Sequence, residues 1–281
     1  MSLNLDIVGV DRAPVESAWA EADVMLYALA VGAGQDDPLA ELGFTTENTG
    51  GEPLQVLPTF GNLIGGGAIW QTAGDFDHAN VVHAEQGFTL HRPLPPHGTA
   101  RTVSRIAGIY DKGSAALVST ESTSVDAATG APLVTARSSL FIRGEGGFGG
   151  SRGPDSDWET PSRPPDQVVT YRTRADQALL YRLTGDRNPL HSDPKVAARG
   201  GFVRPILHGM CTYGYVGRAL LHALCGSEPV RFVSMQGRFT RPVIPGDDLT
   251  VSIWADGNTA CFRTTSNDIR VLDKGRLTFR S

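Results

Sequence analysis

The sequence has few cysteines, no long apolar run and no excess of positive charge. Cys211, Cys225 and Cys261 form no CxxC pair, so neither a disulfide framework nor a zinc site is expected. No stretch approaches the roughly 18 apolar residues of a membrane span, and the first residues lack the basic and apolar segments of a secretory signal. The net charge of -5 disfavours a nucleic-acid-binding surface, which needs clustered Lys and Arg. We therefore expect a cytoplasmic protein with reduced thiols that binds neither membrane nor nucleic acid.

Glycine is abundant instead. The chain of 281 residues contains 33 glycines and 18 prolines, which predict many turns. Together they stay below the roughly 25–30% that marks a low-complexity chain. The length fits one large domain or two small ones, at a prior of roughly 100–200 residues each.

Two segments recur in the same order along the chain, which favours two domains. Residues 86–96 (QGFTLHRPLPP) are echoed by residues 236–245 (QGRFTRPVIP), and residues 26–29 (LYAL) by residues 180–183 (LYRL). Between the copies lies a stretch rich in Gly and Pro without an apolar period, which is typical of a linker. We predict an N-terminal unit over 1–145, a linker over 146–165 and a C-terminal unit over 166–281.

Each half has the pattern of an α+β unit. In the second half, Thr173 and Asp176 suggest a capping box that opens a short helix over 176–183, and a longer helix is predicted over 208–224. Gly214 and Gly217 in that helix suggest that another backbone packs closely there. The apolar and β-branched runs predict strands at 81–90, 100–111, 115–126, 131–143, 231–239, 249–254, 260–265 and 276–279.

A cluster of polar residues lies in a predicted turn after the short helix. Asp186, Asn188 and His191 stand between Gly185 and Pro194. An Asp and a His held in a rigid turn can share one water molecule, which is the arrangement needed for general acid–base chemistry. Alternatively, Asp186 and Asn188 only form Asx turns and His191 is simply buried.

The residues around this cluster resemble a known family signature. The segment 181–194 (YRLTGDRNPLHSDP), with PILHGMCT over 205–212, is similar to the MaoC-like hydratases, in particular the (R)-specific enoyl-CoA hydratase 2 group. The resemblance implies a double hot-dog fold, in which an antiparallel sheet wraps a central helix in each of two units. It also implies syn addition of water to a trans-2-enoyl-CoA, which gives an (R)-3-hydroxyacyl-CoA.

The same resemblance implies roles for individual residues. Asp186 and His191 would hold the water and act as base and acid, and Asn188 would belong to their hydrogen-bond network. Gly209 matches the position whose backbone N–H polarises the thioester carbonyl. The predicted start of a helix at this residue gives that role a physical reason, because unpaired N–H groups there favour negative charge. No cofactor or metal is expected, since a site built from Asp186, Asn188, His191 and Asp193 matches no standard zinc or calcium loop.

Further residues are candidates for binding the CoA thioester. Arg204 and Arg241 are basic residues near the predicted site, although surface arginines are often only solvated. His208 is a candidate substrate-binding residue, with a locally hydrogen-bonded helix start as the alternative. The remaining histidines are expected to be surface or structural residues; they are His78, His83, His91, His97 and His222.

The first half lacks the catalytic set. In the repeat alignment, Gly32, Gly34 and Asp37 stand opposite Asp186, Asn188 and His191. The first half's helix region, residues 58–70, is interrupted by glycines, so its central helix should be shortened or broken. The resemblance implies that the space left there houses the acyl chain, with Gly65 and Gly66 beside it.

These residues support three hypotheses about the function. We expect a hydro-lyase that acts on 2-enoyl-CoA thioesters and forms a homodimer. An acyl-CoA thioesterase on the same fold and a non-catalytic acyl-thioester-binding module are the alternatives. The paired Asp186 and His191 favour hydration.

Overall fold

The computed structural model describes residues 3–65, 68–154 and 158–280. The first half contains five strands and two helices: β1 (Val15–Trp19), α1 (Glu21–Ala30), α2 (Leu42–Thr45), β2 (Val81–Leu90), β3 (Gly98–Asp111), β4 (Ala115–Asp126) and β5 (Pro132–Arg143). The second half contains β6 (Gln167–Arg172), α3 (Gln177–Tyr181), α4 (Pro194–Arg199), α5 (Gly209–Cys225), β7 (Phe232–Phe239), β8 (Asp248–Asp256), β9 (Thr259–Ser266) and β10 (Ile269–Phe279). All eight strands predicted from the sequence are therefore present.

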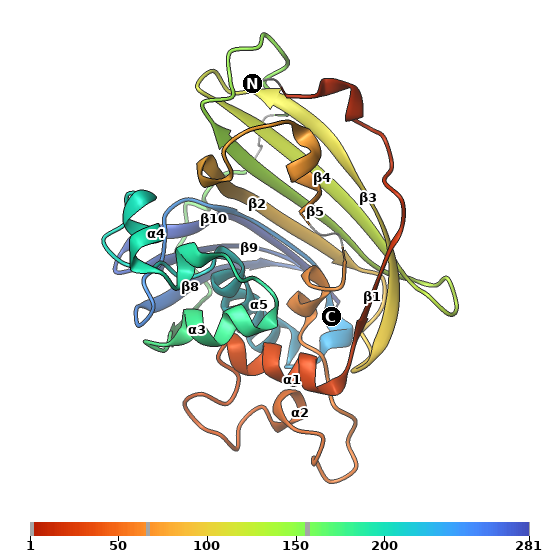
Figure 1. Ribbon diagram of the computed structural model, residues 1–281. Coiled ribbons are helices and arrows are strands. Elements are labelled where there is room, and N and C mark those ends of the chain that lie inside the picture. Colours follow the sequence, from red (N-terminus) through yellow and green to blue (C-terminus); the bar gives the residue numbers. More distant parts are fainter. Residues whose placement is uncertain (1–2, 66–67, 155–157, 281) are drawn as a thin grey trace.

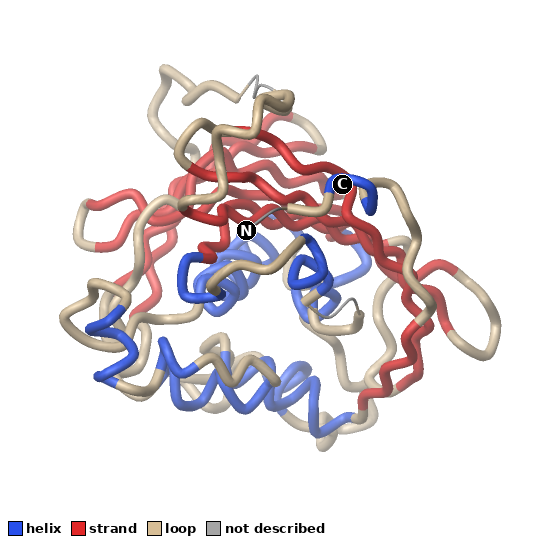
Figure 2. The backbone as a smooth tube through the Cα atoms, turned by 45° about the horizontal axis from the view of Figure 1, so that its top comes forward, coloured by secondary structure: helices blue, strands red, loops and turns tan. Residues whose placement is uncertain are grey.

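The strands form one continuous antiparallel sheet rather than two separate ones. Its order is β1-β3-β4-β5-β2-β7-β10-β9-β8-β6, so five strands of each half follow one another in corresponding order. The sheet arches over the helices in Figure 2, and the two halves are seen side by side in Figure 1. The two units are joined where β2 pairs with β7.

The recurring Gln-Gly sequence lies at this junction. Gln86 is opposite Gly237 and Gly87 is opposite Gln236, so the two copies pair antiparallel with each other. Glu85 and Arg238 face each other on the same strands and form an ion pair. The repeat noted in the sequence therefore marks the local two-fold relation between the units.

The long helix α5 is the core of the second unit. Twelve of its residues are buried, and it begins one residue after the predicted start. Gly214 and Gly217 do allow close packing, but the prediction of a neighbouring backbone was wrong. A Cβ on Gly214 would overlap the side chain of Val31, and one on Gly217 would overlap Thr59. Both of these side chains belong to the first unit, so the two glycines let that unit pack against α5.

The first unit has no helix equivalent to α5 among its described residues. The segment instead forms the 3₁₀ turns η2 (Pro58–Asn62) and η3 (Ile69–Ala73), which confirms that the helix is broken there. Gly66 and Gly67 lie outside the described residues. The remaining 3₁₀ turns are η1 (Leu5–Ile7), η4 (His78–Asn80), η5 (Arg182–Thr184), η6 (Pro189–His191) and η7 (Pro229–Arg231).

The predicted capping box was also wrong. Asp176 is the N-cap of α3 but makes no capping hydrogen bond with its side chain. The hydroxyl of Thr173 donates to the backbone oxygen of Asp247, and the Arg174 N–H donates to Gln177 Oε1. Thr173 therefore contacts the loop before β8 instead of capping the helix, and Gln177 rather than Asp176 supplies the local side-chain bond to a backbone N–H.

A polar network also ties the first unit to α5. Glu41, in the loop before α2, accepts hydrogen bonds from Arg218 at 2.7 and 2.8 Å and contacts His222 Nε2 at 2.7 Å. Burial alone would raise the pKa of Glu41, but the bonds to His222, Arg218 and the Gly34 N–H lower it to about 2. The carboxylate is thus held charged inside the interface.

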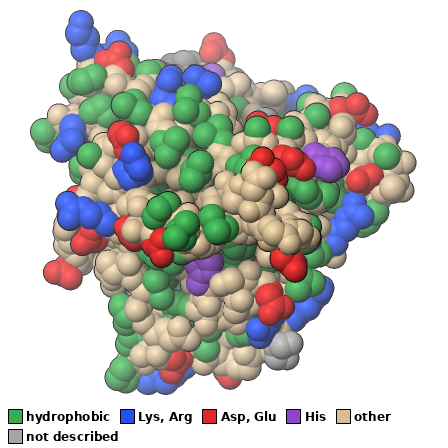
Figure 3. Space-filling model, turned by 90° about the horizontal axis from the view of Figure 1, so that it is seen from below, with side chains coloured by type: hydrophobic (Ala, Val, Ile, Leu, Met, Phe, Trp, Pro, Cys, Tyr) green, Lys and Arg blue, Asp and Glu red, His purple; other side chains and the backbone are tan. Residues whose placement is uncertain are grey.

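Between β5 and β6, the described residues form neither helix nor strand. This segment lies against the sheet: Asp111 accepts the N–H groups of Gly147 and Gly149, and Trp158 Nε1 donates to the Gly275 carbonyl. Within the described ranges, no helix is long and apolar enough to span a membrane. On the face shown in Figure 3, acidic and basic side chains are interspersed.

Candidate active site

Two consecutive Asx turns shape the polar turn of the second unit. Asp186 Oδ1 accepts the N–H of Asn188 at 3.0 Å, and Asn188 Oδ1 accepts the N–H of Leu190 at 3.0 Å. Pro189 then opens the 3₁₀ turn that ends at His191. The Asx turns considered as an alternative are thus present. They are compatible with chemistry, because they make the turn rigid and do not use the second carboxylate oxygen of Asp186 or the amide nitrogen of Asn188.

His191 and His208 tie this turn to the start of α5. The His191 Nδ1–H donates to the Ile206 carbonyl at 2.8 Å, and the His208 Nε2–H donates to the Asp186 carbonyl at 3.2 Å. The two rings stack with centroids 3.8 Å apart at an interplanar angle of 29°. Because carbonyl oxygens only accept, both bonds assign the tautomers: the other ring nitrogens, His191 Nε2 and His208 Nδ1, carry lone pairs.

Both imidazoles are held neutral by their surroundings. Burial lowers the pKa of His191, against the opposing effects of the Ile206 bond and the charge of Asp186. Burial and the neighbouring His191 lower the pKa of His208 to about 4. Near neutral pH, His191 therefore offers a basic Nε2, and Asp186 lies exposed beside it.

Gly209 is the first residue of α5, with His208 as the N-cap. At this position the backbone N–H has no acceptor within the helix, and the helix dipole favours negative charge nearby. A Cβ on Gly209 would lie 3.3 Å from the ring of Phe239. The geometry thus provides a donor N–H near the Phe239 ring and next to the turn that contains Asp186 and His191.

The first unit contributes a residue that sequence reasoning missed. The ring of His83 on β2 lies 4.8 Å from that of Phe239, and its Nε2 is 2.9 Å from Ser138 Oγ. Desolvation lowers the pKa of His83 to about 4, while the charge of Asp186 acts in the opposite direction. No local motif surrounds His83, so only the pairing of β2 with β7 could place it beside the site.

The candidate CoA-binding arginines lie on adjoining segments. Arg204 precedes α5 and Arg241 follows β7, and both are exposed. The Leu207 N–H donates to the Val243 carbonyl at 2.8 Å, which joins the two segments. The structure therefore brings both arginines to the side of the site where α5 begins. Their contacts among the described residues do not show that either one binds a ligand.

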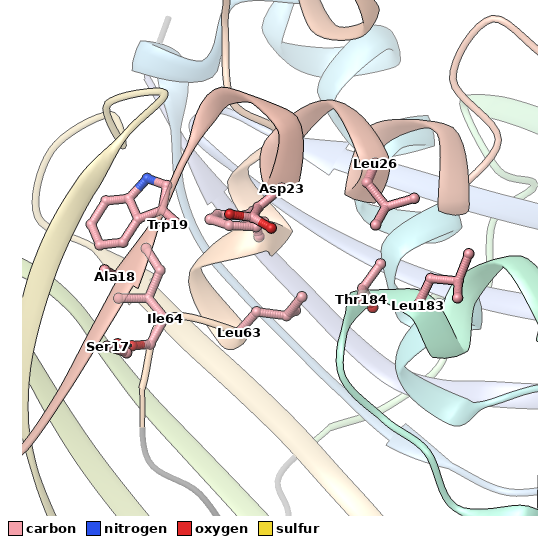
Figure 4. A pocket seen from close by; sticks show the side chains of 10 residues that line it. Ser17, Ala18, Trp19, Asp23, Leu26, Leu63, Ile64, Leu183 and Thr184 are labelled. Atoms are coloured by element: carbon pink, nitrogen blue, oxygen red, sulfur yellow. Dashed lines mark hydrogen bonds between the residues drawn. The ribbon is translucent and has the colours of Figure 1, made fainter.

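A cavity of about 160 Å³ lies between the first unit and η5 of the second unit, close to the polar turn. Figure 4 shows Leu63, Ile64 and Trp19 on one side of it and Leu183 and Thr184 on the other. Its lining residues are Ser17, Ala18, Trp19, Asp23, Leu26, Phe60, Leu63, Ile64, Leu183 and Thr184. Thr184 is two residues before Asp186, so this cavity and the polar turn are neighbours.

Gly65 does not face this cavity. A Cβ there would overlap Thr102 Oγ1 and lie 2.7 Å from Ser124 Oγ. Those two hydroxyls are hydrogen-bonded to each other on β3 and β4. The expectation of open space beside Gly65 was therefore wrong: this glycine lets the loop lie against the sheet. Gly66 lies outside the described residues.

Asp186, His191 and His208 also have possible metal-ligand atoms within 4.8 Å of one another. A shared metal requires lone pairs that converge on one point. An imidazole lone pair lies in the plane of its ring, so two rings stacked with centroids 3.8 Å apart hold their lone pairs in separate layers, and one nitrogen of each ring is bonded to a backbone carbonyl. The arrangement fits proton transfer better than metal ligation.

Comparison with known proteins covers both halves of the chain. Residues 157–274 match the MaoC like domain, and residues 18–144 match the MFE-2 hydratase 2 N-terminal domain. Enoyl-CoA hydratase ChsH3 of Mycobacterium tuberculosis is 44% identical over 92% of this chain and 91% of its own length. The peroxisomal enoyl-CoA hydratase 2 of Arabidopsis thaliana is 37% identical over 93% and 90%, respectively. The crystal structure of a MaoC-like dehydratase from Phytophthora capsici superimposes with a TM-score of 0.88 at 29% identity, covering 99% of this chain and 98% of that one.

Proposed function

Because the chain belongs to the MaoC-like dehydratase family, with an N-terminal domain of the MFE-2 hydratase 2 type, we propose that it is a hydro-lyase that hydrates trans-2-enoyl-CoA to (R)-3-hydroxyacyl-CoA. The expected α+β double hot-dog fold is confirmed by the structural match. The observation that carries the reaction is the neutral His191 close to Asp186: its Nδ1–H is bonded to the Ile206 carbonyl, which leaves the Nε2 lone pair for a water, and polar atoms of the two side chains lie within 4.8 Å of each other.

Asp186 and His191 would activate one water molecule between them. His191 Nε2 accepts a proton from the water while the water oxygen attacks C3 of the enoyl thioester. The Asp186 carboxylate accepts a hydrogen bond from the other O–H of the water. The accepted proton then returns to C2 on the same face of the substrate. One water is consumed, with OH added at C3 and H at C2, which is a net syn addition. Asn188 supports this step through its backbone bond to Asp186.

The Gly209 N–H would stabilise the charge that forms on the thioester oxygen. Attack at C3 develops enolate character, so a donor aimed at this oxygen binds the transition state more strongly than the substrate. The first turn of α5 supplies such a donor, and its dipole has the matching sign. Because glycine has no Cβ, the thioester can approach the backbone closely.

The rest of the substrate would extend in two directions. The apolar residues around the cavity, such as Leu63, Phe60 and Leu183, suit an acyl chain. Arg204 and Arg241, at the start of α5 and the end of β7, suit the phosphates of CoA. We further propose a cytoplasmic homodimer, with one active site in each chain.

Loss of the enoyl absorbance with a series of trans-2-enoyl-CoAs, followed by chiral analysis of the product, tests this proposal. Asp186→Asn should lower kcat by a factor on the order of 10²–10⁴. Asp193→Asn is the matched control, because Asp193 caps α4 and Asn is an equally good cap. An (S) product, or no turnover at any chain length, contradicts the proposal. Release of free thiol from a saturated acyl-CoA would point to a thioesterase, and binding without turnover to an acyl-thioester-binding module.

A further inference from the structure

His208 is deeply buried in an unusual hydrogen-bonding state. Its side chain is 1% exposed, and although it is the N-cap of α5 it makes no capping bond with its ring. The Nε2–H instead crosses to the carbonyl of Asp186. The Nδ1 acceptor is buried and has no partner among the described residues.

An unpaired buried acceptor costs stability, so this histidine is not the residue that would stabilise the site best. An aromatic ring without nitrogens would fill the same space and avoid that cost. Proteins keep such unfavourable groups mainly where function requires them. The function must then lie in what the ring contacts, which is the face of His191 and the backbone of Asp186.

We propose that His208 is a positioning residue for the hydration reaction: its ring covers His191, and its Nε2–H holds Asp186, so that both groups face the same water. This role rests on the proposed function. It differs from substrate binding, because the two atoms that could contact a ligand are bonded to Asp186 or buried.

The two contacts have separable effects. The stacked ring excludes solvent from one face of His191, and desolvation is the main cause of the lowered pKa of that imidazole. The bond to the Asp186 carbonyl holds the start of the turn against α5. A displacement of about 1 Å at a reacting group can reduce the rate by on the order of 10²-fold.

Other charged and titratable groups also surround the two rings. Asp186 faces both of them, Arg182 on η5 lowers the pKa of His208, and the ring of Tyr181 on α3 lies 5.0 Å from His208. His83 faces Asp186 from β2. These groups are unchanged in the variants below, so a shift in the titration of His191 reports on the ring at position 208.

Two substitutions separate the contacts. His208→Phe keeps the ring and removes the donor: we expect kcat to fall by about 10- to 100-fold, with the acid limb of the kcat/KM profile at the wild-type pH. His208→Gln keeps an N–H donor and removes the ring: we expect a smaller loss in kcat, with the acid limb moved to higher pH, because water reaches His191. The Phe variant should be at least as stable as the wild type, because it removes the unpaired buried Nδ1, whereas the Asp186 carbonyl that loses its partner belongs to an exposed residue and can bind water.

Thr212→Val is the matched control. Thr212 lies one turn further along α5, and its hydroxyl is also buried without a partner in the described part of the chain. This variant should gain stability and keep both kcat and the pH profile. Wild-type activity of His208→Phe would overturn the proposal. So would a parallel loss of stability and kcat in His208→Phe and His208→Gln in which the acid limb of the kcat/KM profile does not move in either variant.

The pKa of His191, measured by NMR in the same variants, distinguishes this proposal from the proposed function. If the wild-type chain hydrates no enoyl-CoA, the proposed function fails. The NMR titration then still reports whether the ring of His208 controls His191: the pKa should rise in His208→Gln and stay in His208→Phe. Equal pKa values in all three proteins would refute that control.

Discussion

Replacing Gly209 with proline should remove the backbone donor at the start of α5 without breaking the helix. Proline is well tolerated at the first helical position, where its missing N–H would have no partner in the helix. The residue before a proline must be extended, and His208 already has φ -57° and ψ 133°. Gly209→Pro is therefore a substitution that acts on one hydrogen bond.

Gly209→Ala is the matched control for the added bulk. Its Cβ would lie 3.3 Å from the Phe239 ring, which requires only a small shift of that ring, and its N–H remains. We expect the alanine variant to fold normally and to lose only the activity that its Cβ costs by holding the thioester further from the backbone. The proline variant should lose on the order of 10²–10³ in kcat, or about 3–4 kcal/mol of transition-state stabilisation, which is typical of a lost oxyanion donor.

The measurement is kcat for enoyl-CoA hydration in both variants, with melting curves to establish that both fold. Because both residues carry a Cβ, the comparison of Pro with Ala measures the effect of replacing the N–H by the N–Cδ bond of proline. A folded proline variant whose kcat lies within about threefold of the alanine variant would refute the role of this N–H. The oxyanion would then have to be stabilised by another group.

Three further predictions concern stability and substrate range. The pKa of Glu41 is about 2 in the folded protein, below its ordinary 4.5, so the charged carboxylate stabilises the fold above about pH 4.5 and this stabilisation is lost as the pH falls toward 2. Glu41→Gln should lower the free energy of unfolding, measured in urea at pH 7, by about 3 kcal/mol. It should also flatten the dependence of stability on pH in the acid range. Gly217→Ala should destabilise by about 1–3 kcal/mol through overlap with Thr59, and Thr59→Ser, which removes the overlapping methyl group, should restore part of this in a double-mutant cycle. Leu63→Trp should fill the cavity and lower kcat/KM for long acyl chains more than for short ones, and an unchanged chain-length profile would place the chain elsewhere.

The two edge strands of the sheet, β1 and β6, were not predicted from the sequence. β1 and β6 each have one neighbouring strand and are mostly exposed, so the alternation of buried and exposed positions along them is weak: Trp19 is buried, but the inward positions of β6 are only half-buried. The interior strands have two neighbours and a buried face, which imposes such a pattern. The long helix α5 was predictable for the same reason, because its apolar residues recur at helical spacing.

The candidate site divides in a similar way. The rigid turn from Asp186 to His191 is local: Asx turns and Pro189 determine it over a few residues, so the sequence identified it. The tautomer of His191 is not local, because it depends on the Ile206 carbonyl in another segment. The place of His83 depends on the pairing of β2 with β7 across the two units.

The sequence by itself determined the class of fold, the duplicated organisation and the residues of the polar turn, because periodicity and turn chemistry act between near neighbours. Only the tertiary structure decided which groups meet: the two stacked histidines, the side chains that need Gly214 and Gly217, and the cavity between Leu63 and Leu183. These contacts join segments far apart in the chain, where packing and desolvation rather than local preference determine the outcome.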